Sequence, residues 1–359
     1  MSIGCQRVVT WTLGQTDPMG ERIQLFKPWM GREEHDALRE PLETGWIGSG
    51  PKVLEFERQF ASYSTKTNNI AVNSASAAAF LIFAYLKETY GVCNVYTTPL
   101  GFTSPAWASK HFGHNLVFVD LNQQLLMDPD DYKHKRIHTP NIAKSVVMPV
   151  LYGGVSTIED WVLFGDEIVV TDSAHCATPT LRSHFTFFSF HPYKPICTSD
   201  GGMISTDNNE ATEYFRSYRN FGRQSQGSSY DLTQNGFKFY MNNLNATLGL
   251  ISLEQYEEDL VQRKWNLKFI TAGCPNTQFL NHDGHSSYYF ATAIDENADR
   301  KLEELGIQRN YPLLHKTTYF ADGATLPHAE AIHNKILNIP IHQHLTSHEL
   351  TTIVEVING

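Results

Sequence analysis

The sequence lacks several features that mark secreted and membrane-spanning proteins. Its five cysteines are odd in number and widely spaced, which fits neither a disulfide framework nor a zinc site. The longest apolar run, Ala77–Leu86, is shorter than the ~20 residues that cross a bilayer. The first residues show no charged segment followed by an apolar one, which is the pattern of a secretory signal. We therefore expect a soluble, cytoplasmic protein without a membrane partner.

Positive charge is also scarce, because 28 Lys and Arg are outnumbered by 38 Asp and Glu and leave a net charge of −10. A nucleic-acid-binding protein would show a basic face, so we expect no nucleic-acid partner. The 16 histidines lack the His-Glu-x-x-His pattern, and no paired cysteines accompany them, so we expect no metal. The serine-hydrolase elbow and the glycine-rich loops of P-loop and Rossmann proteins are absent too.

One stretch that is present, residues 185–206, has several features of a reactive site. It opens with an apolar, aromatic run typical of a buried strand, passes through a turn that holds a single lysine, Lys194, and ends in paired glycines and a returning strand. A lysine in an apolar pocket loses its hydration shell, so its neutral amine becomes available to form a Schiff base. An exposed lysine on a hairpin is the alternative, and this stretch alone favours it.

A second stretch supports the chemical interpretation. Residues 167–172 form an apolar run that ends in Asp172 and is followed by small residues up to His175. A carboxylate at the end of a buried strand is costly unless it meets a cation. A protonated pyridine nitrogen is such a cation, and a Schiff-base lysine with an aspartate is the pairing that pyridoxal 5'-phosphate (PLP) enzymes use.

Three short runs occur in order along the chain: TDSAH ends at His175, SFHPYK ends at Lys194, and SDGGMISTDN begins at Ser199. Together they resemble the PLP block of the DegT/DnrJ/EryC1/StrS family of sugar-nucleotide aminotransferases, which reads close to EDAAH, SFHPxK and GEGGxxxTN/D. The resemblance extends from about Ile23 to the C-terminus. It implies PLP as the cofactor, with pyridoxamine 5'-phosphate as its aminated form, and a homodimer with the active site at the interface.

The resemblance also implies an α/β fold of the aspartate-aminotransferase type (PLP fold type I). This fold has a mostly parallel central sheet flanked by helices and a smaller C-terminal α+β domain. The large domain would span residues 1–250, with 1–20 as a loose arm, and the small domain 251–359. The residue pattern agrees, because expected strands at 70–73, 95–99, 116–120, 145–150 and 167–172 alternate with helical or turn segments. We expect helices at 32–44, 53–63, 77–90, 210–219, 244–260 and 300–305 and a strand at 288–294.

The family's cofactor contacts fall on specific residues of this chain. Lys194 would form the Schiff base and, once released, carry a proton, while Asp172 would keep the pyridine nitrogen protonated. His175 would pack beside the ring or its hydroxyl, and a histidine of the core is an equal alternative. Hydroxyl residues at a helix start leave backbone N–H groups free for a phosphate. The remaining contacts would be Ser189, Ala75 (where the family usually has glycine), Ser76 and, from the partner subunit, Lys238 for the phosphate, and Phe102 stacked on the ring.

The substrate follows from the same resemblance. Family members with SFHPxK mostly aminate C4 of the sugar, whereas those acting at C3 more often carry tyrosine at the position of His191, a candidate catalytic residue. We therefore predict transfer of an amino group from L-glutamate to a nucleotide-linked 4-keto-6-deoxyhexose, with Trp46, Tyr193 and His315 near the substrate. The alternatives are C3 amination, a PLP-dependent sugar dehydratase and a non-catalytic protein of the same fold. Dehydratases of the family carry histidine in place of Lys194.

Overall fold

The fold is described by a computed structural model that covers residues 22–28, 30–140, 142, 144–155, 163–178, 182–224, 231–280, 286–321 and 323–359. The predicted N-terminal arm at residues 1–20 lies outside these ranges. Within them, no helix is both long enough and apolar enough to cross a membrane.

Among the described residues, the central sheet has seven strands, β1 (Asn68–Val72), β2 (Asn94–Thr97), β3 (Asn115–Phe118), β4 (Ser145–Met148), β5 (Ile168–Asp172), β6 (Phe185–Ser189) and β7 (Gly202–Thr206). Their order is β1-β7-β6-β5-β4-β2-β3. The pairs from β3 through β2, β4 and β5 to β6 are parallel, whereas β7 is antiparallel to both β6 and β1. The predicted fold class, a mostly parallel sheet flanked by helices, is confirmed.

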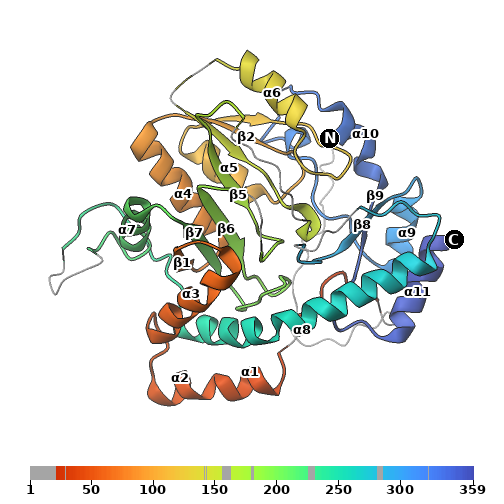
Figure 1. The fold of residues 1–359 in the computed structure, drawn as a ribbon, viewed down its shortest axis with the longest axis horizontal. Helices are drawn as coiled ribbons and strands as arrows, with labels where there is room; N and C mark the ends of the chain where they lie inside the picture. Colours follow the sequence, from red (N-terminus) through yellow and green to blue (C-terminus); the bar gives the residue numbers. More distant parts are fainter. Residues whose placement is uncertain are drawn as a thin grey trace, which may run out of the picture.

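Helices surround this sheet and continue into the C-terminal part, where two further strands pair (Figure 1). The strands β8 (Ala291–Ile294) and β9 (Ile336–Ile339) are antiparallel to each other. The helices are α1 (Arg32–Ala37), α2 (Arg39–Thr44), α3 (Pro51–Ser64), α4 (Ala75–Tyr90), α5 (Thr103–His111), α6 (Pro129–His138), α7 (Asn209–Tyr218), α8 (Asn243–Gly273), α9 (Ala298–Leu305), α10 (Pro327–Ile332) and α11 (Ser347–Asn358). Short 3₁₀ turns occur at η1 (Tyr152–Gly154), η2 (Leu314–Lys316) and η3 (His333–Lys335).

Both faces of the sheet are covered, because side chains alternate along each strand. Ile70 of β1 and Phe187 of β6 belong to a buried cluster with residues of α4 and α7. Their neighbours Ala71 and Phe188 belong to a second cluster with residues of α3 and α8. Burial on both faces explains why the strands read as continuous apolar runs.

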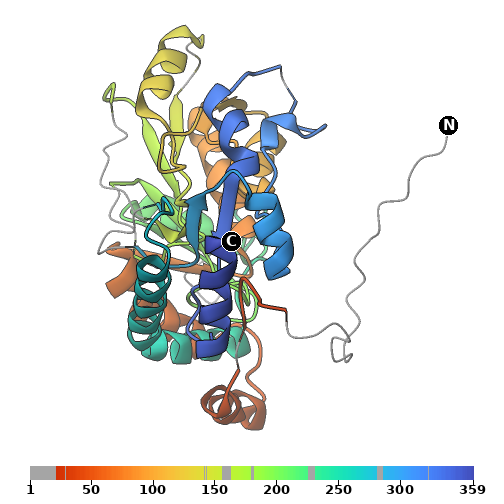
Figure 2. The same ribbon diagram turned by 90° about the vertical axis from the view of Figure 1, so that its right-hand side faces the viewer.

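The C-terminal part lies against α8, which crosses the lower half of the molecule in Figure 1, above α1 and α2. Figure 2 shows α11 standing beside α8, and Leu253 of α8 shares one buried cluster with Leu337 of β9 and Ile353 of α11. The helix predicted at 244–260 continues to Gly273, and only the last part of the strand predicted at 288–294 is regular. The boundary predicted at residues 250 and 251 falls inside α8, and the division into two domains stays a prediction.

The helix predicted at 32–44 is two helices, α1 and α2, separated at Leu38. Pro41 explains the break, because a proline has no N–H to donate to the carbonyl four residues earlier and its ring crowds that carbonyl. Gly45 then ends α2 in the left-handed conformation with φ of 72°, which glycine adopts without strain. The loop that follows carries Trp46.

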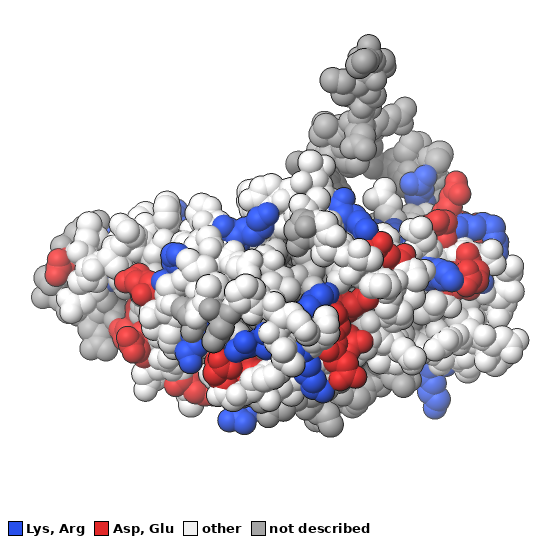
Figure 3. Space-filling view, turned by 90° about the horizontal axis from the view of Figure 1, so that it is seen from above, with Lys and Arg blue, Asp and Glu red and all other residues white. Residues whose placement is uncertain are grey.

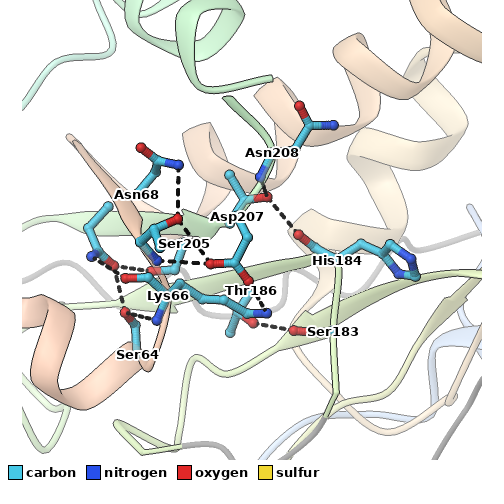
Figure 4. Close-up of polar contacts among 12 residues, drawn as sticks. Ser64, Lys66, Asn68, Ser183, His184, Thr186, Ser205, Asp207 and Asn208 are labelled. Atoms are coloured by element: carbon cyan, nitrogen blue, oxygen red, sulfur yellow. Dashed lines mark hydrogen bonds and ion pairs between the residues drawn. The ribbon is translucent and has the colours of Figure 1, made fainter. Parts of the chain in front are cut away.

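A polar cluster joins β1 to β7 at the end of the pair opposite Val72 and Gly202 (Figure 4). Asp207, just after β7, accepts hydrogen bonds from Lys66 Nζ at 2.8 Å and from the Thr67 backbone N–H at 2.9 Å. Ser205 Oγ donates to Asn69 Oδ1 at 2.6 Å. The residues that these bonds join are at least 136 positions apart in the sequence. The bonds therefore hold the register of the β1–β7 pair.

Surface charges of both signs are interspersed on the face shown in Figure 3. Elsewhere on the molecule, ion pairs join different elements, among them Lys52 with Glu40 at 2.9 Å and Arg136 with Asp166 at 3.0 Å. Ion pairs at the surface contribute about 0–1 kcal/mol each.

Candidate active site

The sequence-predicted residues meet where parallel strands end. Asp172 is the last residue of β5, Ser189 is the last residue of β6, and Lys194 lies in the turn after β6. The start of α4 reaches the same place, and a cavity of about 440 Å³ lies between these elements. Open α/β sheets bind ligands at the carboxyl ends of their strands, which makes this cavity the candidate active site.

Lys194 projects a nucleophilic amine toward this cavity. Its Nζ lies 3.3 Å from the hydroxyl of Tyr289 and 4.6 Å from the centre of the Tyr289 ring. Burial lowers the pKa of the Lys194 amine to about 7, because loss of hydration disfavours the charged form, and the nearby charge of Asp172 opposes this shift. A sizeable share of the amine is therefore neutral near neutral pH, as a Schiff-base nucleophile requires.

Asp172 is a buried carboxyl with few partners. It is 4% exposed, and its Oδ1 accepts a hydrogen bond from the Ala174 backbone N–H at 3.0 Å. Burial raises the pKa of Asp172 to about 6, although this N–H and the charge of Lys194 both act in the opposite direction. A buried carboxyl with a raised pKa gains stability from a cation placed beside it, and its side chain lines the cavity where such a cation could bind.

His175 is held in one tautomer. The Gly153 backbone N–H donates to its Nδ1 at 3.2 Å, so the proton of the neutral ring is on Nε2, which lies 2.9 Å from the Tyr311 hydroxyl. Burial lowers the pKa of His175 well below its ordinary value. Its ring stacks on Tyr311 with 16° between the planes and 5.7 Å between the centroids. His175 lines the cavity as a neutral donor.

The start of α4 offers anion-binding groups. Ser74 Oγ caps the helix by accepting from the Ala77 backbone N–H at 3.1 Å, and its carbonyl accepts from Ala78. The preceding amides, of Ala75 and Ser76, are left without a hydrogen-bond partner among the described residues. Ser76 Oγ lies 2.8 Å from Ser104 Oγ. Both serines line the cavity, as do Ser74 and Ala75.

A glycine permits this arrangement. A Cβ on Gly202 would lie 2.5 Å from the Ser74 carbonyl carbon and 2.6 Å from the Ala75 nitrogen. Backbone atoms cannot move aside as a flexible side chain would, so only glycine lets β7 pass this close to the helix start. Gly202, the second of the paired glycines, therefore lets β7 pass beside the α4 amides at the cavity.

Other predicted residues also line the cavity. Ser189, His191 and Tyr193 come from β6 and the following turn. Phe102 precedes α5, is 56% exposed, and contacts Tyr311 edge-on at 6.2 Å between centroids. The structure thus brings together ten of the residues that the sequence singled out: Ala75, Ser76, Phe102, Asp172, His175, Ser189, His191, Tyr193, Lys194 and the motif residue Asp200.

Three predicted residues do not line the cavity. Lys238 is exposed, and its Nζ lies 5.7 Å from the centre of the Tyr240 ring. Trp46 is 58% exposed and donates its indole N–H to the Ser49 carbonyl at 3.2 Å. His315 is buried in η2, 3.2 Å from Glu330 Oε1. Their assigned roles in binding stay predictions.

Among the lining residues that sequence reasoning missed are Phe26, Tyr289, Asn310 and Tyr311, which come from segments far from Lys194 in the sequence. Phe26 stacks on Tyr289 at 4.5 Å and 12°. Tyr289 reads as part of an apolar strand, so nothing in its local pattern marks it as a site residue. Tyr311 precedes the Pro-Leu-Leu-His run, and its φ of 67° is unusual for a bulky side chain and often accompanies a functional site.

Comparison with known proteins agrees with this geometry. The sequence pattern of the DegT/DnrJ/EryC1/StrS aminotransferase family matches residues 28–358. The chain belongs to this family. It is therefore an aminotransferase, and the predicted family and enzyme class are both confirmed.

Individual relatives cover nearly the whole aminotransferase chain. The spore coat polysaccharide biosynthesis protein SpsC of Bacillus subtilis is 28% identical over 373 residues, covering 92% of this chain and 95% of that protein. The putative sugar aminotransferase Spr1654 of Streptococcus pneumoniae has a TM-score of 0.84 at 23% identity, covering 94% and 97% of the two chains. Helicobacter pylori PseC, an aminotransferase of pseudoaminic acid biosynthesis, has a TM-score of 0.86 at 19% identity, covering 94% and 98%. The two structures show the same fold.

Proposed function

We propose that this aminotransferase uses PLP to transfer the amino group of L-glutamate to C4 of a nucleotide-linked 4-keto-6-deoxyhexose. The observation that carries the proposal is the presence of Lys194 and Asp172 in one cavity, at the ends of neighbouring parallel strands. When bound, PLP supplies a ring that withdraws electrons from the carbon that loses a proton. Lys194 would hold the cofactor covalently and, when released, would carry the proton between carbon atoms.

The residues of the cavity fit this cofactor. Asp172 is a buried carboxyl that gains from a cationic pyridine N–H beside it, and that partner would lower its raised pKa. The amides of Ala75 and Ser76 and the hydroxyls of Ser76 and Ser189 suit the phosphate. His175 would donate its Nε2 proton near the ring, and Phe102 would cover one ring face. Together these groups hold the ring in one orientation against Lys194.

The proposed sugar substrate rests on the family and on the other residues of the cavity. SpsC is named for spore coat polysaccharide biosynthesis and Spr1654 as a putative sugar aminotransferase, which supports a sugar as the amine acceptor. His191 and Tyr193 line the cavity beside Lys194. The histidine in the SFHPxK run supports amination at C4 rather than C3. Trp46 and His315 do not line this cavity and stay candidate substrate contacts.

We further propose a homodimer in the cytoplasm, with one active site near each subunit boundary. Lys238 is exposed and does not line the cavity of its own subunit. A residue that reaches the partner's phosphate has to lie at the surface in this way. Phe237, next to it, is 54% exposed, and burial of such a side chain would favour association. The described cysteines are all free, which suits a reducing compartment.

The test is an absorbance experiment on purified protein with added PLP. We expect a visible band that disappears on addition of L-glutamate and returns on addition of a nucleotide-linked 4-keto-6-deoxyhexose. Lys194→Ala should abolish the band and borohydride trapping of the cofactor, whereas Lys133→Ala, at an exposed position on α6, should leave both unchanged. NMR of the product then locates the new amine at C4. A wild-type protein that binds PLP without a borohydride-stable adduct at Lys194 refutes the proposal.

A further inference from the structure

The contact between Lys194 and Tyr289 links two residues that are 95 positions apart. We propose that Tyr289 is a positioning residue that holds the released ε-amine of Lys194 in both of its protonation states during proton transfer. This inference rests on the proposed role of Lys194. It assigns a task to a tyrosine that neither the family motifs nor the sequence pattern singles out.

The position of Tyr289 is fixed from several sides. Its ring is 4.5 Å from that of Phe26, nearly parallel at 12°, and 4.5 Å from that of His175. Its backbone N–H donates to the Gly153 carbonyl at 3.2 Å. A Cβ on Gly154, which has φ of 78°, would lie 3.1 Å from Tyr289 Cβ and from its nitrogen. Tyr289 is 5% exposed, so its hydroxyl has little freedom to leave Lys194.

A proton carrier needs a partner that suits both of its forms. In its proposed role, Lys194 would receive a proton at Nζ from the Cα of the amino donor and would release it from the same Nζ to a carbon of the cofactor. Its neutral form can accept a hydrogen bond, whereas its ammonium form can only donate. A phenol hydroxyl does both, so Tyr289 can donate to the amine or accept from the ammonium without losing its own proton.

The surroundings of Tyr289 keep it in the form that this task requires. Burial raises the pKa of Tyr289 well above its ordinary value, so the hydroxyl stays protonated wherever Lys194 titrates. The face of the Tyr289 ring lies 4.6 Å from Nζ, within the range at which an aromatic ring attracts an ammonium group. Ring and hydroxyl therefore keep the released amine on one side of the cavity.

The first test measures the Lys194 amine itself, in protein without cofactor. The rate of reductive methylation of Lys194, followed by mass spectrometry across pH, reports the pKa of its amine. We expect Tyr289→Phe to lower this pKa by about half a unit to one unit, because a hydrogen bond to a charged group is worth more than one to a neutral group. Tyr288→Phe is the matched control, since Tyr288 does not line the cavity, and should leave the pKa unchanged.

The second test measures proton transfer in the loaded enzyme. With L-glutamate deuterated at Cα, we expect Tyr289→Phe to slow the glutamate half-reaction about tenfold and to increase its isotope effect, with KM for glutamate unchanged. A purely structural role would instead lower the thermal midpoint and the cofactor content and leave the isotope effect as in wild type. If Tyr289→Phe does not fold, 3-fluorotyrosine at position 289 keeps the shape, makes the hydroxyl a weaker acceptor, and should lower the Lys194 pKa in the same direction.

The outcomes separate this inference from the proposed function. If Lys194→Ala retains wild-type transamination, the proposed function fails. If Lys194 is essential but Tyr289→Phe leaves both its pKa and the isotope effect unchanged, only the role of Tyr289 fails. An equal effect of Tyr288→Phe also overturns that role, because the change would then report disturbed packing of the strand.

Discussion

Replacing Asp172 with asparagine should make the cofactor-free protein more stable while it removes activity. The carboxyl is 4% exposed, and burial raises its pKa from 3.8 to about 6. Because one pKa unit corresponds to about 1.4 kcal/mol, the charged form costs about 1–3 kcal/mol of folding free energy above pH 6. An asparagine of the same shape can still accept the Ala174 hydrogen bond and carries no charge.

The sign of the pH dependence follows from the direction of the shift. A raised folded-state pKa means that the folded protein keeps its proton to higher pH than the unfolded chain does. The contribution of Asp172 to stability is therefore greatest below about pH 4, falls as the pH rises to about 6, and stays low above that. The stabilising effect of Asp172→Asn should accordingly be largest at pH 8 and small at pH 4.

The assay is urea denaturation of the cofactor-free protein at pH 4.5 and pH 8, with Asp130→Asn as a control at an exposed position. With PLP, Asp172→Asn should lower the rate of the glutamate half-reaction at least 100-fold, because the pyridine nitrogen loses its anionic partner. A variant that is less stable than wild type at pH 8 would refute the reasoning. So would a stability difference that is the same at both pH values.

Three further substitutions test the surroundings of the cavity. Ser76→Ala should weaken PLP binding about ten- to 100-fold by equilibrium dialysis, because it removes a hydrogen bond to a charged phosphate. Gly202→Ala should lower both the urea midpoint and PLP affinity, because its Cβ would meet the backbone of Ser74 at 2.5 Å and overpacking costs about 1–3 kcal/mol. Glu57→Gln should cost about 3–5 kcal/mol in urea denaturation, because Glu57 is buried and binds Arg219 at 2.6 Å and Arg216 at 3.0 Å.

Each of these has its own control and its own contrary result. Ser62→Ala, at an exposed hydroxyl on α3, should bind PLP as wild type does, and equal affinity of Ser76→Ala would remove Ser76 from the phosphate site. Normal stability and cofactor binding in Gly202→Ala would show that α4 can shift away from β7. A loss below about 1 kcal/mol for Glu57→Gln would show that the buried ion pair contributes little.

The fold and the reactive pair could be predicted from sequence because their signals are local. Apolar strands alternating with helices predict a parallel sheet, and Asp172 and Lys194 each stand at the end of a strand, where a parallel sheet exposes them together. The glycines at 201 and 202 belong to the same contiguous motif. For these residues, the local sequence pattern therefore indicates both the chemical role of the side chain and its place at a strand end.

Only the tertiary structure decided which other side chains complete the cavity. Tyr289 and Tyr311 come from the C-terminal part and Phe26 from the N-terminal segment, and all three line one cavity with Lys194. Their contacts depend on how distant segments pack, and an aromatic residue that lines a cavity has the same local pattern as one in the core. The tautomer of His175 and the hydrogen bond between Lys194 and Tyr289 are likewise set by backbone atoms and hydroxyls that packing brings within about 3 Å.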